Sequence, residues 1–175
     1  MAVLKIPVNP DDHIQGDPKA PVVLVEYGDY ECPYCGQAYP IVKRVQKHFG
    51  KRMAFVFRNF PLTEVHPNAE IAAQTAEFAA AQGRFWEMHD SLYENQESLG
   101  APLFIALAKK LELSVEDLNS ALTNGTYASR VKNDFMGGVR SGVNGTPTFF
   151  INGNRHDGAF EFEDLVAAIE AHLTK

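Results

Sequence analysis

The sequence predicts an α/β fold in which helices cover a small sheet and a helical segment interrupts the chain between its strands. The early residues follow the order strand, helix, strand, which is a βαβ unit. Helical periodicity then dominates residues 66–142, and two short strands and a helix follow. A chain of 175 residues buries roughly 70% of the surface that its unfolded form exposes. We therefore expect one domain, residues 1–175, whose core needs neither a metal nor a disulfide.

The composition is that of an ordinary globular protein. Hydrophobic residues make up 45% of the chain, and 22 acidic residues against 16 basic ones give a net charge of −6. These values exclude disordered, collagen-like and disulfide-scaffold proteins, and the negative charge repels phosphate backbones. The longest apolar runs, such as residues 21–25, fall far short of the ~20 residues that span a bilayer. We expect no nucleic-acid partner and no membrane insertion.

Residues 1–21 bear on the cellular compartment. They carry prolines and aspartates where a signal peptide has a continuous apolar segment, and the chain begins with Met1. We therefore expect a cytoplasmic protein. The alternative is a periplasmic or exported protein whose signal peptide has been removed.

The βαβ unit is predicted element by element. Val22–Tyr27 is a short apolar run that suits a strand buried on both faces. A helix begins at Pro33, where the missing N–H is not needed, and ends at Gly50. Its apolar positions recur at three- and four-residue steps at Ala38, Ile41, Val42, Val45 and Phe49. Pro40 should kink this helix because it removes a backbone hydrogen bond, and residues 53–57 form the second strand.

The middle of the chain predicts several helices. Three apolar stripes with helical spacing are interpreted as core. They are Ile71, Thr75, Phe78 and Gln82; Phe85, Met88, His89 and Leu92; and Leu103, Leu107 and Leu111. Ser114 precedes Asp117 by the spacing of a helix N-terminal cap. The last helix of the segment is marked by Val131, Phe135 and Val139.

The chain ends in a strand pair and a helix. Residues 148–151 are strand-like, and residues 152–154, Asn-Gly-Asn, are a turn signal that leads to a short return from Arg155 to Gly158. This pattern predicts a hairpin. The final helix has its apolar residues at Phe162, Leu165, Val166, Ile169 and Leu173.

The only two cysteines, Cys32 and Cys35, stand where the first strand passes into the helix. A helix N-terminus carries partial positive charge and unpaired N–H groups, which stabilise a thiolate at Cys32 and lower its pKa. The thiolate is the attacking species in disulfide exchange. Cys35, one turn further on, is placed to attack a mixed disulfide at Cys32 and release the product. The spacing therefore predicts a redox-active dithiol.

Two other uses of these cysteines fit the sequence less well. A structural disulfide that closes so short a loop contributes roughly 2 kcal/mol, against about 5 kcal/mol for a long loop. Zinc usually needs four ligands, and the chain has no further cysteine. The six histidines show no ligand-like pairing, and they are His13, His48, His66, His89, His156 and His172. We expect no metal site.

With these motifs in view, the chain resembles the DsbA branch of the thioredoxin superfamily. The resemblance rests on ECPYC at residues 31–35 after a buried strand, the helical segment, GTPTFFING at residues 145–153 and the C-terminal helix. It covers the chain from about Pro21 to Lys175. Classical thioredoxins lack the long helical segment between the two motifs.

The resemblance implies a thioredoxin fold with a helical domain inserted after the second strand. Residues 18–62 and 143–175 would form the thioredoxin-fold part, and residues 63–142 the inserted helical subdomain. Pro147 would be the cis-proline beside the cysteines, and Thr146 would touch them and leave its backbone free to pair with an extended substrate strand. Taken alone, Pro147 is a proline at the start of a strand, where no ladder donor is needed.

The resemblance also implies the roles of the active-site residues. Cys32 would be the nucleophile and Cys35 the resolving thiol. Glu26 matches the position of the family's buried acidic residue, whose carboxylate relays the proton of the resolving thiol and whose desolvation would raise its pKa. The alternative for Glu26 is a solvent-facing glutamate at the end of the strand.

The dipeptide between the cysteines departs from the best-known oxidase pattern. Pro33 and Tyr34 stand where that pattern has Pro-His, so an imidazole that could stabilise the thiolate is absent from the dipeptide. Pro-Tyr is the dipeptide of glutaredoxins. Asp29 and Glu31 add negative charge that opposes the thiolate, although exposed charges are screened over ~8 Å at physiological salt. Both features argue against strong oxidising power.

Other aromatic and histidine side chains are interpreted as packing or as a binding rim. Tyr30 and Tyr34 suit the core and an apolar rim for unfolded or peptide substrates equally well, and Tyr27 is equally compatible with the core. His66 and the aromatic pair at residues 85–86 are expected to pack within the helical segment rather than to act in catalysis.

The leading hypothesis is an enzyme that exchanges disulfides with protein substrates through Cys32 and Cys35. No bound cofactor is implied, because the two sulfur atoms carry the electrons. The expected partners are protein or peptide thiol and disulfide substrates, and a second redox protein or glutathione. The direction is open, since thioredoxin-fold potentials span about −270 to −120 mV. Two alternatives are a glutathione-dependent reductase, which Pro-Tyr and a reducing compartment favour, and a non-catalytic peptide-binding or chaperone module on the same fold.

Overall fold

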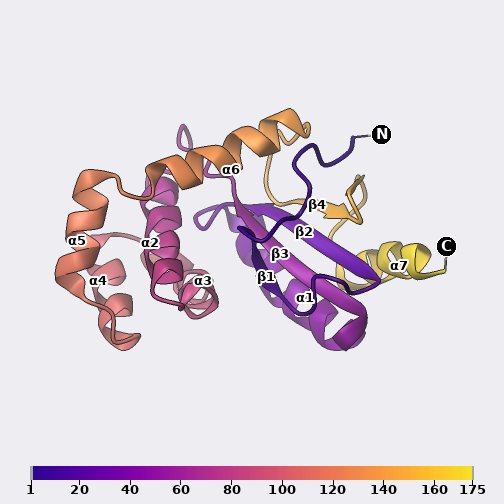
Figure 1. The fold of residues 1–175 in the computed structure, drawn as a ribbon, viewed down its shortest axis with the longest axis horizontal. Helices are drawn as coiled ribbons and strands as arrows, with labels where there is room; N and C mark the ends of the chain where they lie inside the picture. The colour runs from indigo at the N-terminus through magenta and orange to yellow at the C-terminus, as the bar shows by residue number, and fades with distance from the viewer. Residues whose placement is uncertain (1, 175) are drawn as a thin grey trace.

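The computed structural model describes residues 2–174, so Met1 and Lys175 of the expected 1–175 domain lie outside the described residues. A five-stranded sheet occupies the right-hand half of Figure 1, with the strand order β1-β3-β2-β4-β5. The strands are β1 (His13–Gln15), β2 (Val22–Gly28), β3 (Met53–Asn59), β4 (Thr148–Ile151) and β5 (Asn154–His156). β2 and β3 run parallel, and the other neighbouring pairs are antiparallel.

The helices occur along the chain in the predicted order. They are α1 (Pro33–Phe49), α2 (Ala69–Ala81), α3 (Phe85–Glu94), α4 (Ala101–Lys110), α5 (Val115–Asn124), α6 (Ala128–Arg140) and α7 (Phe162–Leu173), with the 3₁₀ helices η1 (Gly50–Arg52) and η2 (Gln96–Ser98). Helix α1 continues past Pro40. Strand β1 is not predicted, because three residues are too few to show an alternating pattern. No helix in residues 2–174 is both long and apolar enough to cross a membrane.

Helices cover both faces of the sheet. In Figure 1, α1 and α7 lie side by side against one face, and α6 passes over the other face toward the helices α2 to α5 on the left. Leu24 and Phe57 belong to the core on the α1 side, whereas Val25 and Val56 belong to a second core that packs against Phe135 of α6. Strand β2 is therefore buried on both faces, as its apolar run predicts.

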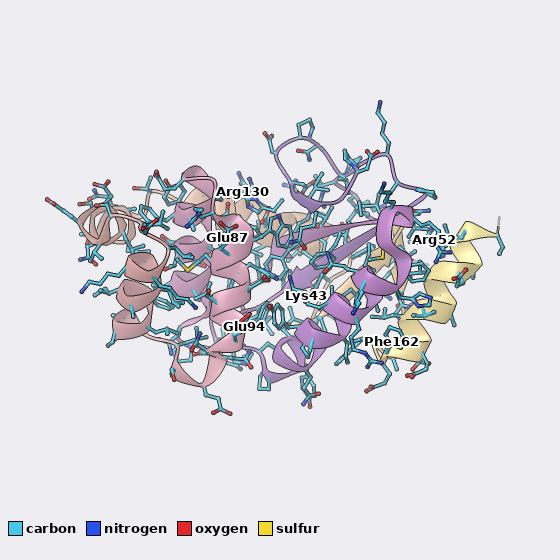
Figure 2. All side chains as sticks on the ribbon, turned by 90° about the horizontal axis from the view of Figure 1, so that it is seen from below. Lys43, Arg52, Glu87, Glu94, Arg130 and Phe162 are labelled. Atoms are coloured by element: carbon cyan, nitrogen blue, oxygen red, sulfur yellow. The ribbon has the colours of Figure 1, made fainter. Side chains whose placement is uncertain are left out.

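Helix α1 joins the helical segment to the C-terminal helix. Figure 2 shows α1, which carries Lys43, between α3, which carries Glu94, and α7, which begins at Phe162. Lys43 Nζ lies 2.9 Å from an Asp90 carboxylate oxygen, and the Tyr39 hydroxyl donates to Glu94 at 3.1 Å. Both contacts tie α1 to α3.

The predicted stripes of the helical segment are buried in one core or packed against it, with one exception. Gln82 is exposed, because α2 ends at Ala81 and Gln82 is its C-cap. The Ser114 hydroxyl accepts a hydrogen bond from the Asp117 N–H at 3.1 Å, which confirms the predicted cap of α5.

The predicted hairpin is confirmed as β4 and β5. Its turn residues Asn152 and Gly153 have φ values of 47° and 82°. These left-handed conformations are those of a two-residue hairpin turn, and Asn-Gly is the pair that adopts them with least strain.

A buried ion pair holds the N-terminal segment to the sheet. The side chains of Arg58 in β3 and Asp12 are 3% and 4% exposed, and two guanidinium nitrogens donate to the two Asp12 oxygens at 2.8 Å. The same guanidinium donates to the carbonyls of Ile6 and Pro7 and to the Tyr27 hydroxyl. Arg58 therefore fastens this segment to the strand pair that leads to the cysteines.

Candidate active site

The turn between β2 and α1 carries both cysteines. Cys32 is the residue before the helix, in an extended conformation, and Pro33 is the first helical residue. Cys35 lies in the first turn of α1 with no exposed surface, whereas Cys32 exposes 3% of its surface. Both are free thiols in this structure. The fold therefore places the dithiol at the N-terminus of α1.

The surroundings of Cys32 favour its thiolate. The hydrogen bond from the Cys35 thiol is the largest of the effects that lower the pKa of Cys32 to about 5. Burial opposes this shift, and the backbone N–H groups of Cys35 and Tyr34 reinforce it. Because this pKa lies well below 7, Cys32 is almost entirely thiolate at neutral pH, whereas an ordinary cysteine is mostly thiol.

We expect the alkylation rate of Cys32 to titrate near pH 5. Iodoacetamide reacts with the thiolate, so its rate rises as the pH passes upward through this pKa and then becomes constant. Cys35→Ala removes the leading hydrogen bond and moves the midpoint up by about one unit or more, whereas Cys35→Ser, which keeps a donor, moves it less. A wild-type midpoint near the ordinary value of about 8.5 would contradict this account.

The pKa of Cys35 is shifted in the opposite direction. Burial, the hydrogen bond with Cys32 and the charge of Glu26 raise its pKa well above the ordinary range of a thiol. The backbone N–H of Asp29 donates to the Cys35 Sγ at 3.5 Å. Cys35 is therefore a neutral thiol at a pH where Cys32 is ionised.

Glu26 lies in β2 and exposes 3% of its surface, so the solvent-facing alternative is excluded. Burial raises the pKa of Glu26 to about 8, and the charge of Cys32 adds to the shift. The Glu26 charge in turn raises the pKa of Cys35. A buried carboxyl with this pKa changes its protonation close to neutral pH, and its charge acts on Cys35, the thiol that is harder to ionise.

The Thr146–Pro147 segment lies beside Cys32. The peptide bond between these two residues is cis, and the Cys32 Sγ lies 3.5 Å from the Thr146 carbonyl oxygen. A pocket of about 300 Å³ next to Pro147 is lined in part by Arg155 and Phe160. The structure thus brings Thr146 and Pro147 to Cys32.

Asp29 is a central residue of the turn, although no motif in the sequence indicates this role. It is 1% exposed, so its interpretation as an exposed, screened charge is wrong. Its carboxylate accepts hydrogen bonds from the N–H groups of Glu31 at 2.7 Å, Cys32 at 3.1 Å and Leu62 at 2.8 Å, and from His66 Nδ1 at 2.8 Å. These four donors allow a carboxylate to be buried here. His66, interpreted as packing, is in fact a polar partner of the turn.

Further contacts fasten the same turn to the helical segment. Glu31 accepts hydrogen bonds from the backbone and side-chain nitrogens of Asn68 at 2.9 and 2.7 Å. The Gln96 amide in η2 donates to the carbonyls of Tyr30 at 2.9 Å and Cys32 at 2.8 Å. No sequence signal indicates these partners, because they belong to no motif and come together only in the fold.

The three tyrosines near the turn have different environments. Tyr27 and Tyr30 are fully buried, so the rim interpretation is wrong for Tyr30. The Tyr30 hydroxyl forms a 2.9 Å hydrogen bond with Nδ1 of His89 in the core. Tyr34 exposes 62% of its surface next to Cys32, and its contact with substrates stays a prediction.

His89 belongs to the core, as its stripe predicts. It exposes 2% of its surface, and burial lowers its pKa well below the ordinary value, so the ring is neutral. In residues 2–174, no three His, Cys, Asp or Glu side chains are grouped so that they could hold a metal ion.

Residues 8–171 match a protein-family model described as thioredoxin. Among solved structures, oxidised BdbD from Bacillus subtilis has a TM-score of 0.88 at 27% identity, over 99% of each chain. The α-DsbA1 protein of Wolbachia pipientis has a TM-score of 0.83 at 21% identity, over 98% of this chain and 94% of that one. These likenesses confirm the predicted fold.

The curated relatives are of a different kind. The Na⁺/H⁺ antiporter NhaA 1 of Salinispora arenicola is 46% identical over 167 residues, which are 95% of this chain and 26% of the antiporter. The antiporter NhaA of Herminiimonas arsenicoxydans is 38% identical over 170 residues, which are 97% of this chain and 27% of the antiporter. The chain spans about a quarter of the length of the curated relatives it matches.

Proposed function

The chain belongs to the thioredoxin family and is similar to its DsbA-like thiol-disulfide oxidoreductases, and from this premise we propose that it exchanges disulfides with protein substrates. Cys32 is the nucleophile and Cys35 the resolving thiol. The observation that supports this proposal most strongly is the split in acidity, since the pKa of Cys32 is lowered to about 5 and that of Cys35 is raised. A structural disulfide would need no such difference.

In the capture step, the Cys32 thiolate attacks one sulfur of a substrate disulfide. The substrate S–S bond breaks, the other sulfur leaves as a thiolate, and a mixed disulfide joins Cys32 to the substrate. The substrate backbone pairs with Thr146 beside Pro147, as an extended strand adds to a sheet edge. The short contact between Cys32 and the Thr146 carbonyl supports this placement, because it brings the reacting sulfur to the end of β4.

In the resolution step, Cys35 loses its proton toward Glu26 and attacks the Cys32 sulfur. The mixed disulfide breaks, the second substrate sulfur leaves as a thiolate, and a Cys32–Cys35 disulfide remains. The substrate is thereby reduced by two electrons and the enzyme is oxidised. Each step is reversible, so the same residues also oxidise substrates when the enzyme begins as the disulfide.

Glu26→Gln is expected to slow resolution roughly tenfold or more at pH 7, because an amide cannot accept the Cys35 proton. Capture at Cys32 should continue, so the mixed disulfide accumulates. The measurement is the rate at which a preformed mixed disulfide with glutathione releases glutathione, followed by rapid acid quench. Glu163→Gln on the exposed surface of α7 is the control. Equal release rates for Glu26→Gln and wild type would remove Glu26 from the proposal.

The equilibrium reduction potential of the Cys32–Cys35 pair in glutathione buffers tests the proposed function. A value near about −120 to −180 mV indicates an oxidant or isomerase and argues against the expected cytoplasmic location. A value near about −270 mV or below indicates a reductase suited to a reducing compartment. A pair that forms no reversible disulfide would contradict the proposal.

Two alternatives are separated by simple assays. A glutathione-dependent reductase, which the Pro33-Tyr34 dipeptide favours, would turn over in a glutathione-coupled assay that measures reduction of mixed disulfides. A peptide-binding or chaperone module would keep its function when Cys32 and Cys35 are both replaced by serine. Loss of function in that double variant favours disulfide exchange.

The similarity to antiporters supports a second proposal: one of the protein partners of this chain is a Na⁺/H⁺ antiporter. Cys35→Ser prevents resolution, so protein partners stay attached to Cys32 as mixed disulfides and can be identified after purification. An antiporter among the trapped proteins supports this partner. Trapped proteins that include no antiporter would contradict it and leave disulfide exchange itself intact.

We also propose the division of the chain expected from the resemblance. Residues 18–62 and 143–175 form the thioredoxin-fold part, and residues 63–142 form the inserted helical subdomain. The placement of α2 to α6 between β3 and β4 supports this division.

A further inference from the structure

An imidazole lies behind the active-site turn, although the dipeptide between the cysteines contains none. His66 comes from the segment between β3 and α2, and its side chain is 18% exposed. Its Nδ1 lies 2.8 Å from Asp29 Oδ2, and Asp29 Oδ1 lies 3.1 Å from the backbone nitrogen of Cys32. One carboxylate therefore connects the imidazole to the amide of the nucleophile.

We propose that His66 is a positioning residue that, through Asp29, sets the acidity and reduction potential of Cys32. This inference deepens the proposed function and rests on it. Each oxygen of Asp29 accepts two hydrogen bonds, with Glu31 and Cys32 on Oδ1 and Leu62 and His66 on Oδ2. Because the three other donors are backbone N–H groups, His66 is the one side chain among residues 2–174 that forms a hydrogen bond with this buried carboxylate.

Two effects of His66 act in the same direction. A buried carboxylate next to Cys32 disfavours the thiolate by like-charge repulsion, and a donor on its far oxygen reduces that repulsion. The same hydrogen bond fixes the carboxylate plane, so that Oδ1 holds the Glu31 and Cys32 amides and with them the start of α1. The N–H groups of Tyr34 and Cys35 that lower the pKa of Cys32 belong to that first turn.

The other charged groups near the turn do not replace His66. Glu31 is also acidic, and its carboxylate accepts hydrogen bonds from Asn68. Glu26 is a buried acid in β2 whose charge opposes ionisation of Cys35. Two imidazoles form hydrogen bonds with the turn. His89 bonds to the Tyr30 hydroxyl and is kept neutral by burial, whereas His66 is the one that bonds to the Asp29 carboxylate.

The test compares His66→Leu, which removes the donor, with His66→Asn, which keeps a neutral donor on the same side-chain atom position. His66→Leu is expected to raise the pKa of Cys32, measured by the pH dependence of alkylation, by about one unit. It is also expected to lower the equilibrium constant for reduction by glutathione about tenfold, which is about 30 mV toward a more reducing couple. His66→Asn should stay within about threefold of wild type in this equilibrium.

His48→Leu, at an exposed position near the far end of α1, is the matched control and should leave both quantities unchanged. Denaturant unfolding shows whether each variant is folded, and His66→Ala replaces His66→Leu if the latter does not fold. A folded variant without the imidazole that titrates like wild type overturns the inference. The alkylation titration needs no disulfide, so it tests His66 even if the pair never forms a reversible disulfide, an outcome that would contradict the proposed function instead.

Discussion

Replacing Cys32 by serine is expected to abolish disulfide exchange. The loss should be on the order of 10³-fold or more, the scale at which an enzyme loses its nucleophile. Cys35 cannot take over, because it has no exposed surface and its pKa is raised. The measurement is the rate at which the chain reduces or oxidises a peptide with two cysteines, with denaturant unfolding to show that the fold is intact.

Cys35→Ser is the matched control for this experiment. It removes the same atom type one turn away and leaves Cys32 able to attack, so a mixed disulfide with the peptide should form and persist. Mass spectrometry after acid quench detects this species, which Cys32→Ser cannot form. If Cys32→Ser kept more than about a tenth of the wild-type rate, or if Cys32→Ser formed a mixed disulfide at Cys35, the assigned roles would be wrong.

Replacing Arg58 by methionine is expected to lower the free energy of unfolding by about 3–5 kcal/mol, because it leaves the Asp12 carboxylate buried without its partner. The carbonyls of Ile6 and Pro7 lose their donors in the same change. The measurement is the midpoint and slope of denaturant unfolding. Combining Arg58→Met with Asp12→Leu should recover part of the loss, since a buried ion pair replaced by apolar side chains is often close to neutral.

Arg52→Met provides the matched control. Arg52, labelled in Figure 2, lies 3.6 Å from Glu170, and the two side chains are 49% and 42% exposed. An exposed pair is worth little, so this change should alter the free energy of unfolding by less than about 0.5 kcal/mol. If Arg58→Met and Arg52→Met lowered the free energy of unfolding by similar amounts, burial would not determine how much the Arg58–Asp12 pair contributes to stability.

The parts of the site that the sequence predicts are those that belong to local motifs. Cys32 and Cys35 follow a buried strand and stand at the start of a helix, so both are recognised from their immediate neighbours. Pro147 directly precedes β4, and its place beside the cysteines is predicted from the family resemblance. The resemblance to the DsbA-like family predicts Glu26, and the sequence alone leaves a solvent-facing glutamate as the alternative. The helix order is likewise predicted from the 3.6-residue period, because each helix buries one face.

The remainder could not be predicted, because it depends on contacts between distant segments. The partnership of Asp29 with His66 requires the segment after β3 to fold back onto the turn before α1. The side chain of Tyr30 points inward although it follows the strand, since no period governs the direction of a side chain in a turn. Strand β1 exists because β3 offers a free edge to it, which its own three residues do not indicate.

The Gln96 amide has a consequence for how a substrate meets this protein. It holds the carbonyls of Tyr30 and Cys32, while Asp29 holds the amides of Glu31 and Cys32. Backbone N–H and C=O groups around Cys32 are therefore already hydrogen-bonded before a substrate binds. A loop that is already ordered loses little conformational entropy on association, so the enzyme side of the encounter is preorganised. The entropy that remains to be lost is then chiefly that of the substrate chain, which favours substrates whose cysteines lie in segments that are already held extended.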